Sequence, residues 1–417
     1  MKKNLLSPLL SIICILFCNC SRDDTSGNEQ IIEMTNQGVI PCENGIAAGK
    51  YPCKGYDFVS HITLEQMNAE TGNDSWGWTD PVTNKEYALI GLDNGTAFID
   101  ISIPESPRYI GKLPTATVSS SWRDVKVYNN TAFIVSEAKG HGLQVFDLTK
   151  LRNAGEATTF TADVHYTDFG SAHNIVINPL SGYAYVVGAK NLNGSQALYN
   201  GGPLFINIQN PLVPKNEGGY AEKAYSHDAQ VITYNGPDPG YIGKEILIGS
   251  NENELAIVDI TDKSNPIAIS TISYAQVGYT HQGWFTEDMK YFLLGDELDE
   301  TREGFNTRTI IFNMEDLDVP QEHMMFTGTT SAIDHNGYVK GNLFYLANYQ
   351  AGMRVIDISD IANKNIAEIG FFDTFPTSNA ADFKGAWNVY PFFKSGNIVI
   401  SDINSGFILV RKKMIKI

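Results

Sequence analysis

Two short stretches of similar sequence indicate the fold of the chain: Ala256-Ile257-Val258-Asp259-Ile260 and Arg354-Val355-Ile356-Asp357-Ile358. Each is an apolar, β-branched run that carries an acid near its end, which is typical of a buried β-strand. A second apolar run precedes each stretch, at 246–250 and 343–348, and a variable loop separates the two. The pattern therefore predicts a strand pair that occurs more than once in the chain.

The same unit recurs seven times between about residues 70 and 412, at roughly fifty residues per copy. Its second and third strands are predicted at 87–92 and 96–101, 132–136 and 143–148, 184–188 and 204–208, 246–250 and 255–260, 291–295 and 309–313, 343–348 and 353–358, and 398–402 and 407–411. Seven four-stranded units predict an all-β, seven-bladed β-propeller. The last copy lacks a fourth strand, so we expect the unpartnered run 57–66 to complete that blade and close the ring.

Four histidines follow one another at a spacing of 54 residues: His173, His227, His281 and His335. Each opens a predicted first strand and is followed by an amide or an acid. The first strand of every blade lines the central channel of a propeller, so the fold should bring the four imidazoles together at one mouth. Arg123 and Trp387 hold the equivalent place in two other copies.

Loops that open at the same mouth carry further polar side chains. Neutral imidazole and carboxylate together suit Zn²⁺, Mn²⁺ or Fe²⁺, and the same groups serve as general acids and bases. The four histidines are thus candidate metal ligands, with Glu297 or Asp299 as the catalytic base if the protein is an enzyme. The side chains expected to contact a ligand are Arg123, Glu137, His141, Glu252, Asp296, Trp387 and Asp402.

A purely structural interpretation stands beside this one. A residue repeated in every blade often serves the blade, and a histidine at a strand start can hydrogen-bond the neighbouring blade. The acidic run 296–300 could equally be a solvated loop, and its spacing does not match an EF-hand calcium loop. No nucleophile elbow, phosphate loop or dinucleotide fingerprint is present. We therefore favour a binding module over an enzyme and assign no certain cofactor; the alternative is a metal-dependent hydrolase or lyase.

The first residues predict export. Lys2 and Lys3 precede an apolar run at 5–17, so residues 1–19 read as a signal peptide. Cys20-Ser-Arg-Asp-Asp resembles the start of a bacterial lipoprotein, with Cys20 as the lipidated residue. The acids after it resemble signals that send lipoproteins to the outer surface of Gram-negative bacteria.

Domain organisation and cysteine pairing follow from that start. We expect residues 20–40 to form a polar tether and residues 41–417 a single propeller. Once the signal peptide is removed, Cys42 and Cys53 are the two cysteines left to form a disulfide. The formal net charge of −17 argues against a nucleic-acid partner. The expected partners are the membrane, through the lipid, and an extracellular protein, a glycan or a small ligand.

Motifs in a fixed order complete the pattern, among them Trp76-Gly-Trp-Thr-Asp80, His141-Gly-Leu-Gln-Val-Phe-Asp147, Ala172-His-Asn-Ile-Val-Ile177 and Thr280-His-Gln-Gly-Trp284. The third strands resemble the LVIVD repeat. The order of motifs over about residues 41–413 resembles the choice-of-anchor B family of bacterial surface and secreted proteins. That resemblance implies a propeller fold and an exported location, and it implies no particular reaction.

Overall fold

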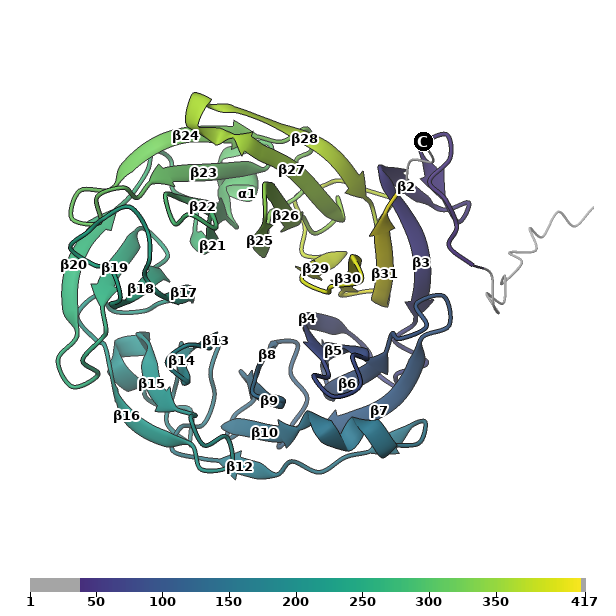
Figure 1. Ribbon diagram of the computed structural model, residues 1–417, viewed down its shortest axis with the longest axis horizontal. Coiled ribbons are helices and arrows are strands. Elements are labelled where there is room, and N and C mark those ends of the chain that lie inside the picture. The colour runs from purple at the N-terminus through teal and green to yellow at the C-terminus, as the bar shows by residue number, and fades with distance from the viewer. Residues whose placement is uncertain (1–37, 414–417) are drawn as a thin grey trace, which may run out of the picture. The chain divides into compact units, whose positions relative to one another are not determined.

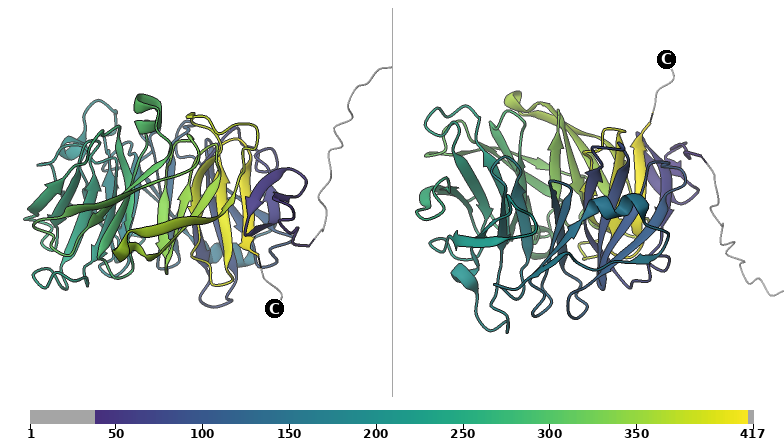
Figure 2. Two further views of the ribbon diagram at one scale, coloured as in Figure 1. Left: turned by 90° about the horizontal axis from the view of Figure 1, so that it is seen from above. Right: turned by 60° about the horizontal axis from the view of Figure 1, so that its bottom comes forward.

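The computed structural model describes residues 38–413, in which seven mainly antiparallel sheets stand around a central channel (Figure 1). The seven-bladed β-propeller is thereby confirmed. Figure 2 shows the same ring from other directions, with strands running between its two faces and loops connecting them there. The predicted signal peptide, the lipidated Cys20 and most of the tether lie outside the described residues.

The first four blades follow the chain in order, each with its first strand innermost. Blade 1 contains β4 (Gly72–Thr79), β5 (Glu86–Leu92), β6 (Gly95–Asp100) and β7 (Arg108–Pro114), with β11 (Thr158–Thr159) parallel to β7. Blade 2 contains β8 (Arg123–Tyr128), β9 (Thr131–Ser136), β10 (Leu143–Asp147) and β12 (Val164–Tyr166). Blade 3 contains β13 (Asn174–Asn178), β14 (Tyr183–Val187), β15 (Leu204–Asn207) and β16 (Lys215–Gly219). Blade 4 contains β17 (Asp228–Thr233), β18 (Glu245–Ser250), β19 (Leu255–Asp259) and β20 (Ile267–Ile272).

The last three blades include the helix and the N-terminal strands. Blade 5 contains β21 (Thr280–Phe285), β22 (Tyr291–Asp296), helix α1 (Asp299–Glu303), β23 (Arg308–Asn313) and β24 (Gln321–Thr327). Blade 6 contains β25 (Gly337–Lys340), β26 (Leu343–Ala347), β27 (Met353–Asp360) and β28 (Asn365–Phe372). Blade 7 contains β29 (Ala386–Tyr390), β30 (Asn397–Asp402), β31 (Gly406–Lys412) and β3 (Tyr56–Ile62). Short 3₁₀ turns lie at Leu148–Asn153, Leu198–Gly201 and Ile361–Asn363.

The ring closes through β3, which pairs antiparallel with β31. Asp57 lies opposite Arg411 and Ile62 opposite Phe407, so the N-terminal strand supplies the fourth strand that the last repeat lacks. The predicted closure is confirmed. Both ends of the propeller are thus held in one sheet, and β31 has no free edge.

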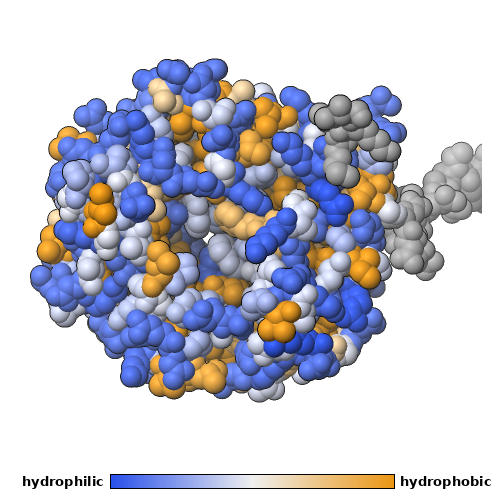
Figure 3. All heavy atoms as spheres, viewed as in Figure 1, coloured by the Kyte–Doolittle hydropathy of each residue, from blue (hydrophilic) through white to orange (hydrophobic). Residues whose placement is uncertain are grey.

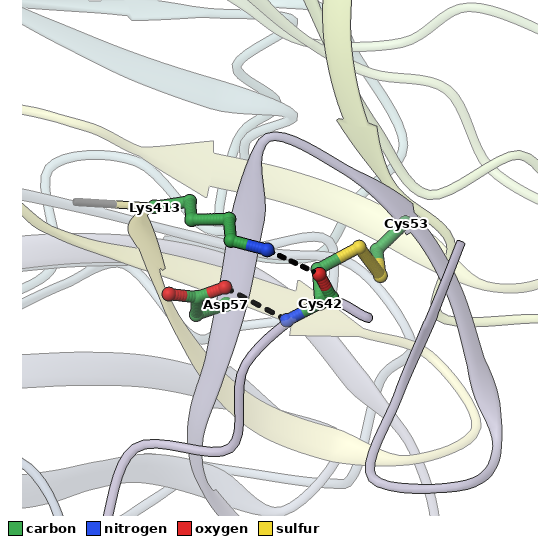
Figure 4. Close-up of a disulfide and its surroundings, with 4 residues drawn as sticks. All are labelled: Cys42, Cys53, Asp57 and Lys413. Carbon is green, nitrogen blue, oxygen red and sulfur yellow. Dashed lines mark hydrogen bonds between the residues drawn. A yellow bond between two sulfur atoms is a disulfide. The ribbon is translucent and has the colours of Figure 1, made fainter. Parts of the chain in front are cut away.

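A disulfide-bonded hairpin reinforces the seam beside this closure (Figure 4). Strands β1 (Ile46–Ala47) and β2 (Tyr51–Lys54) extend blade 6, because Cys53 pairs with Phe372 of β28. Cys53 is bonded to Cys42, as predicted. The amide of Cys42 donates to Asp57 Oδ1 at 2.8 Å, and Lys413 Nζ donates to the Cys42 carbonyl at 2.7 Å. The disulfide and these two hydrogen bonds therefore connect blade 6 to both β3 and the end of β31 in blade 7.

The core lies between neighbouring blades, because each inner strand is covered on both of its faces. Strand β5 is buried along its whole length, which fits the apolar run that follows its first residue, Glu86. Between blades 1 and 2, Phe98 stacks on Phe146 with ring centroids 4.9 Å apart, alongside Leu89 and Ile134. Most side chains on the face shown in Figure 3 are polar, and that face is hollowed at its centre. No helix within residues 38–413 has the length and apolar character needed to cross a membrane.

Candidate functional site at the channel mouth

The four matching histidines meet at one end of the channel. Successive ring centroids lie 4.1 Å apart for His173 and His227, 4.5 Å for His227 and His281, and 4.5 Å for His281 and His335. Trp387 continues the series, 4.7 Å from His335. We call these four imidazoles the histidine arc. It arises because each side chain occupies the same position in successive blades.

Burial keeps most of the arc uncharged. His227, His281 and His335 are nearly inaccessible to solvent. Burial lowers the pKa of His335 to about 3 and holds the pKa of His227 and of His281 well below the usual value. At neutral pH these imidazoles are therefore neutral, which is the form that can bind a metal ion.

Glu297 lies against the arc, in the loop between β22 and α1. Its Oε2 is 3.6 Å from Nε2 of His281, and its Oε1 is 3.6 Å from Nε2 of His335. Tyr349 donates a hydrogen bond to Oε1 at 3.1 Å, and burial raises the pKa of Glu297 to about 7. His335 Nδ1 donates to the carbonyl of Trp387 at 2.6 Å, which leaves its Nε2 lone pair facing the carboxylate.

These separations suit a shared metal ion better than direct hydrogen bonds. A nitrogen and an oxygen 3.6 Å apart exceed hydrogen-bond length, whereas two ligands of a tetrahedral zinc ion lie about 3.3 Å apart. Ligand atoms of His227, His281 and Glu297 all lie within 4.8 Å of one another. Two neutral nitrogens and one carboxylate oxygen form a donor set that zinc, manganese and iron accept.

A cavity of about 470 Å³ opens over the arc. Five of its twelve lining residues are Phe, Tyr or Trp, and its polar groups include His227 and Glu297. The lining residues are Thr71, Gly72, Ser121, Trp122, His227, Tyr279, Glu297, Leu298, Tyr349, Phe383, Trp387 and Ile403. Such a volume lies in the range of small-molecule sites. Sequence reasoning did not identify Trp122, Tyr349 or Phe383, because loop aromatics carry no repeat signal.

Arg123 and His141, two predicted ligand contacts, bind each other. Both are buried, and the Arg123 guanidinium donates to His141 Nε2 over 2.8 Å, while Arg123 Nε donates to the Leu92 carbonyl. Burial, followed by the nearby positive charge of Arg123, lowers the pKa of His141 to about 3. The pair thus has a structural role and links blade 2 to blade 1.

Three of the remaining predicted acids, Asp296, Asp299 and Asp402, are buried and bind other groups of the protein. Asp296 accepts from the amides of Gly278 and Tyr279, and Asp402 accepts from the amides that follow it, so both hold loops. Asp299 accepts from Arg308 Nε at 2.6 Å. Glu297, rather than Asp299, is therefore the carboxylate that faces the histidines.

The other two predicted acids, Glu137 and Glu252, are exposed and lie at the rim. Glu137 Oε1 is 2.6 Å from His173 Nδ1, and Glu252 accepts a hydrogen bond from Tyr279 at 3.2 Å. Both carboxylates retain contact with solvent and can still reach a ligand.

The acid or amide after each strand-opening residue has a structural role in several blades. Asp74 Oδ2 accepts from the Val125 amide, Asp124 Oδ2 from the Ile175 amide, and Gln282 Oε1 from the Gly337 amide. Each bond runs to the next blade. The structural interpretation therefore applies to these residues, each of which follows directly in sequence the residue at the position of the arc histidines.

Comparisons with known proteins agree with the fold. The LVIVD repeat family matches residues 244–273 and 337–374, which cover strands of blades 4 and 6. A search of the curated proteins finds no match. Among solved structures, hydrazine synthase of Kuenenia stuttgartiensis is similar at a TM-score of 0.51 and 12% identity, over 79% of this chain and 93% of that one.

Two other solved structures are similar to the same degree. The Cps50 (Swd1) β-propeller domain of Myceliophteria thermophila has a TM-score of 0.50 and 9% identity, over 79% of this chain and 94% of that one. A functionally unknown protein from Desulfotomaculum acetoxidans has a TM-score of 0.50 and 11% identity, over 80% of this chain and 98% of that one. At these identities the likeness concerns the fold alone. The chain is thus a seven-bladed β-propeller that contains LVIVD repeats.

Proposed function

We propose that the protein is a binding module that holds its ligand in the cavity over the histidine arc. The observation that carries this proposal is the aromatic cavity of about 470 Å³ with Glu297 and His227 among its polar groups. A closed ring of blades supplies a rigid frame, so little conformational entropy would be lost when a ligand binds.

The chemistry of the lining favours a small polar ligand with a flat face, such as a sugar ring. Tyr279, Tyr349 and Trp387 offer aromatic surfaces, and Glu297 and His227 offer hydrogen-bond partners. An anionic ligand is disfavoured, because the formal net charge is −17 and acids line the rim.

A thermal-shift and glycan-array screen tests the binding proposal. Monosaccharides and glycans that raise the melting temperature of the full chain should lose that effect in Trp387→Ala and Tyr279→Ala. The matched control is Phe392→Ala, which changes an aromatic residue in a separate pocket lined by Trp76, Trp284 and Tyr390 among others. Equal responses of all three variants, or no response of the unaltered protein to any sugar, would exclude this ligand class at this site.

A second candidate function is a metal-dependent hydrolase or lyase that uses the same mouth. It is favoured by the approach of His227, His281 and Glu297 to within 4.8 Å, with His335 beside them. A bound Zn²⁺ would supply Lewis-acid chemistry. His281 and His335 are held neutral by burial, and Tyr349 orients the carboxylate of Glu297.

Metal content separates the two functions. Stoichiometric zinc, manganese or iron in the purified full chain, lost in His227→Ala without a change in circular dichroism, would support the metal centre. Absence of metal after exposure to excess Zn²⁺, together with a lower melting temperature of His227→Ala, would mean that the arc is architectural.

We also propose that the protein is exported and lipid-anchored at Cys20, on the outer membrane and facing the cell surface, as a member of the choice-of-anchor B family. The Cys42–Cys53 disulfide is compatible with an oxidising compartment. Palmitate labelling should depend on Cys20, and Cys20→Ser should release the protein into the soluble fraction. Labelling that persists in Cys20→Ser would contradict this anchor.

A further inference from the structure

A second cavity opens between the inner strands, at a distance from the histidine arc. Its volume is about 330 Å³, and most of its lining residues belong to β4, β8, β13, β17, β21 and β29. Figure 1 shows these strands innermost in the ring. On β21, Trp284 of this cavity lies three residues after His281 of the arc, which corresponds to about 10 Å along a strand. The two cavities have no lining residue in common.

One position of the repeat contributes to both sides of this cavity. It follows the strand-linking acid or amide by two residues, so its side chain extends from the same face of the inner strand. In blades 1, 5, 6 and 7 the residue is aromatic: Trp76, Trp284, Tyr338 and Tyr390. In blades 2, 3 and 4 it is Lys126, Val176 and Gln230. The ring of equivalent residues is thus aromatic on one side only.

The aromatic side is a continuous wall of rings. Measured between ring centroids, Tyr390 lies 5.2 Å from Trp76 and Tyr338 lies 5.0 Å from Trp284, and both pairs are edge to face. Phe392 joins the two pairs, 5.4 Å from Tyr390 and 5.9 Å from Tyr338. Trp76, Trp284, Tyr390 and Phe392 are only partly buried. Partly exposed aromatic surface gathered in one hollow is typical of a binding site.

The opposite side of the cavity is aliphatic. Val176 and Ile177 line it from blade 3, and Val231 lines it from blade 4. A flat ligand between the two sides would therefore contact rings on one face and methyl groups on the other. Gln230 adds a polar group: its Oε1 accepts from the Phe285 amide at 2.9 Å, which leaves its amide nitrogen to donate to a ligand.

The charged groups of the cavity favour an uncharged ligand. Lys126 Nζ lies 3.2 Å from Asp74 Oδ2 and also pairs with Asp124. The same ammonium lies 4.8 Å from the ring centroid of Trp76. Two carboxylates already compensate this charge, so an anion would gain no free cation, and a cationic ligand would meet the ammonium.

We propose that this cavity binds an uncharged, planar aromatic molecule of about two or three fused rings that carries a hydrogen-bond acceptor. The volume lies at the lower end of the range of small-molecule sites, about 300–1,000 Å³. A flat ring packs edge to face or offset against tryptophan and tyrosine, whereas a saturated molecule would bury similar area without those ring contacts. The site is separate from the proposed ligand cavity over the arc, so the two proposals are independent.

Calorimetric titration of the full chain with 2-naphthol tests this proposal. We expect saturable binding of one molecule per chain and a rise of roughly 3 °C in melting temperature. Trp76→Ala and Trp284→Ala should each weaken binding about tenfold. Val176→Trp should abolish binding, because it fills the cavity with the side chain that blades 1 and 5 already carry at this position. We expect that variant to keep its melting temperature, so its loss of binding would not reflect unfolding.

Three comparisons assign the binding to this site and to this ligand class. Trp387→Ala, which alters the cavity over the arc, should bind 2-naphthol as the unaltered protein does. The saturated analogue decahydro-2-naphthol and the anion naphthalene-2-sulfonate should each bind at least about tenfold more weakly than 2-naphthol. Equal binding of either analogue would overturn the stated ligand class. Absence of saturable 2-naphthol binding, or binding that persists in Val176→Trp or is lost in Trp387→Ala, would overturn the site.

Discussion

His141 and Arg123 show how burial and a neighbouring charge determine the protonation of one side chain. His141 accepts from Arg123 at Nε2 and contacts the Gly142 carbonyl through Nδ1, so its neutral form is the one that fits. Protonation would place a second positive charge beside the guanidinium. This is why its pKa falls to about 3.

The lowered pKa of His141 makes the folded protein less stable in acid. The unfolded chain binds a proton at His141 near pH 6.5 and the folded chain only near pH 3, so stability is lost as pH falls between these values. His141→Gln removes that contribution, about 3 kcal/mol at pH 4. Urea unfolding at pH 7.5 and pH 4.5 should therefore show a smaller acid-induced loss in the variant. Equal losses in both proteins would contradict the assignment.

Residue roles were only partly predictable from the sequence. The repeat spacing identified the histidine arc, because equivalent positions must meet in a closed ring. It could not separate Glu297 from Asp299, since both belong to one acidic run. Their directions depend on where α1 begins, which turns Glu297 toward the arc and Asp299 toward Arg308.

At the scale of elements, the predicted second and third strands agree with the observed ones to within a few residues. Alternation and turn residues suffice there, because each strand is apolar and bounded. The additions to the sheets were not predicted. β11 has two residues, and the β1–β2 hairpin pairs with β28, more than three hundred residues away in the chain. Neither has a local signal.

Bonds between inner strands make the neighbouring blades depend on one another. Asp124 accepts from the Ile175 amide of blade 3 at 2.7 Å and forms an ion pair with Lys126. Asp124→Ala leaves a buried amide unpaired and a buried ammonium with one partner fewer, so we expect a loss of about 3–5 kcal/mol. Equilibrium urea unfolding measures it. The exposed Asp262→Ala serves as control and should change stability little.

The disulfide hairpin should stabilise the seam it crosses. Its bond closes a loop over a sequence separation of 11 residues, for which the loss of chain entropy in the unfolded state predicts about 3 kcal/mol. Cys53→Ser should lower the melting temperature, and reduction should lower that of the unaltered protein to a similar value. Hydrogen exchange should rise first in β1, β2 and β28. A variant as stable as the oxidised protein would show that the hairpin adds nothing to the seam.

At the scale of the whole molecule, the repeat count was the most predictable property, because seven similar units leave little choice of architecture. Closure was predictable for a related reason: a propeller with one three-stranded blade needs a strand from elsewhere. The repeat pattern does not predict the positions at which single blades depart from it. The aromatic residues over the arc are departures from it, and they line the proposed ligand site.

Ring closure by β3 leads to a prediction for the entire fold. A shortened chain that begins at Thr63 lacks β3 and the disulfide hairpin, so β31 would expose its edge and the apolar contacts of Phe58 and Val59 would be lost. We expect broad, non-cooperative thermal unfolding and concentration-dependent association through the open edge. A chain that begins at Gly38 keeps every described strand and should melt as one transition. Calorimetry and light scattering compare the two. If the shorter chain stayed monomeric and melted as sharply as the longer one, the first and last blades would hold the ring together by side-chain packing alone, and closure by the N-terminal strand would not be what stabilises the propeller.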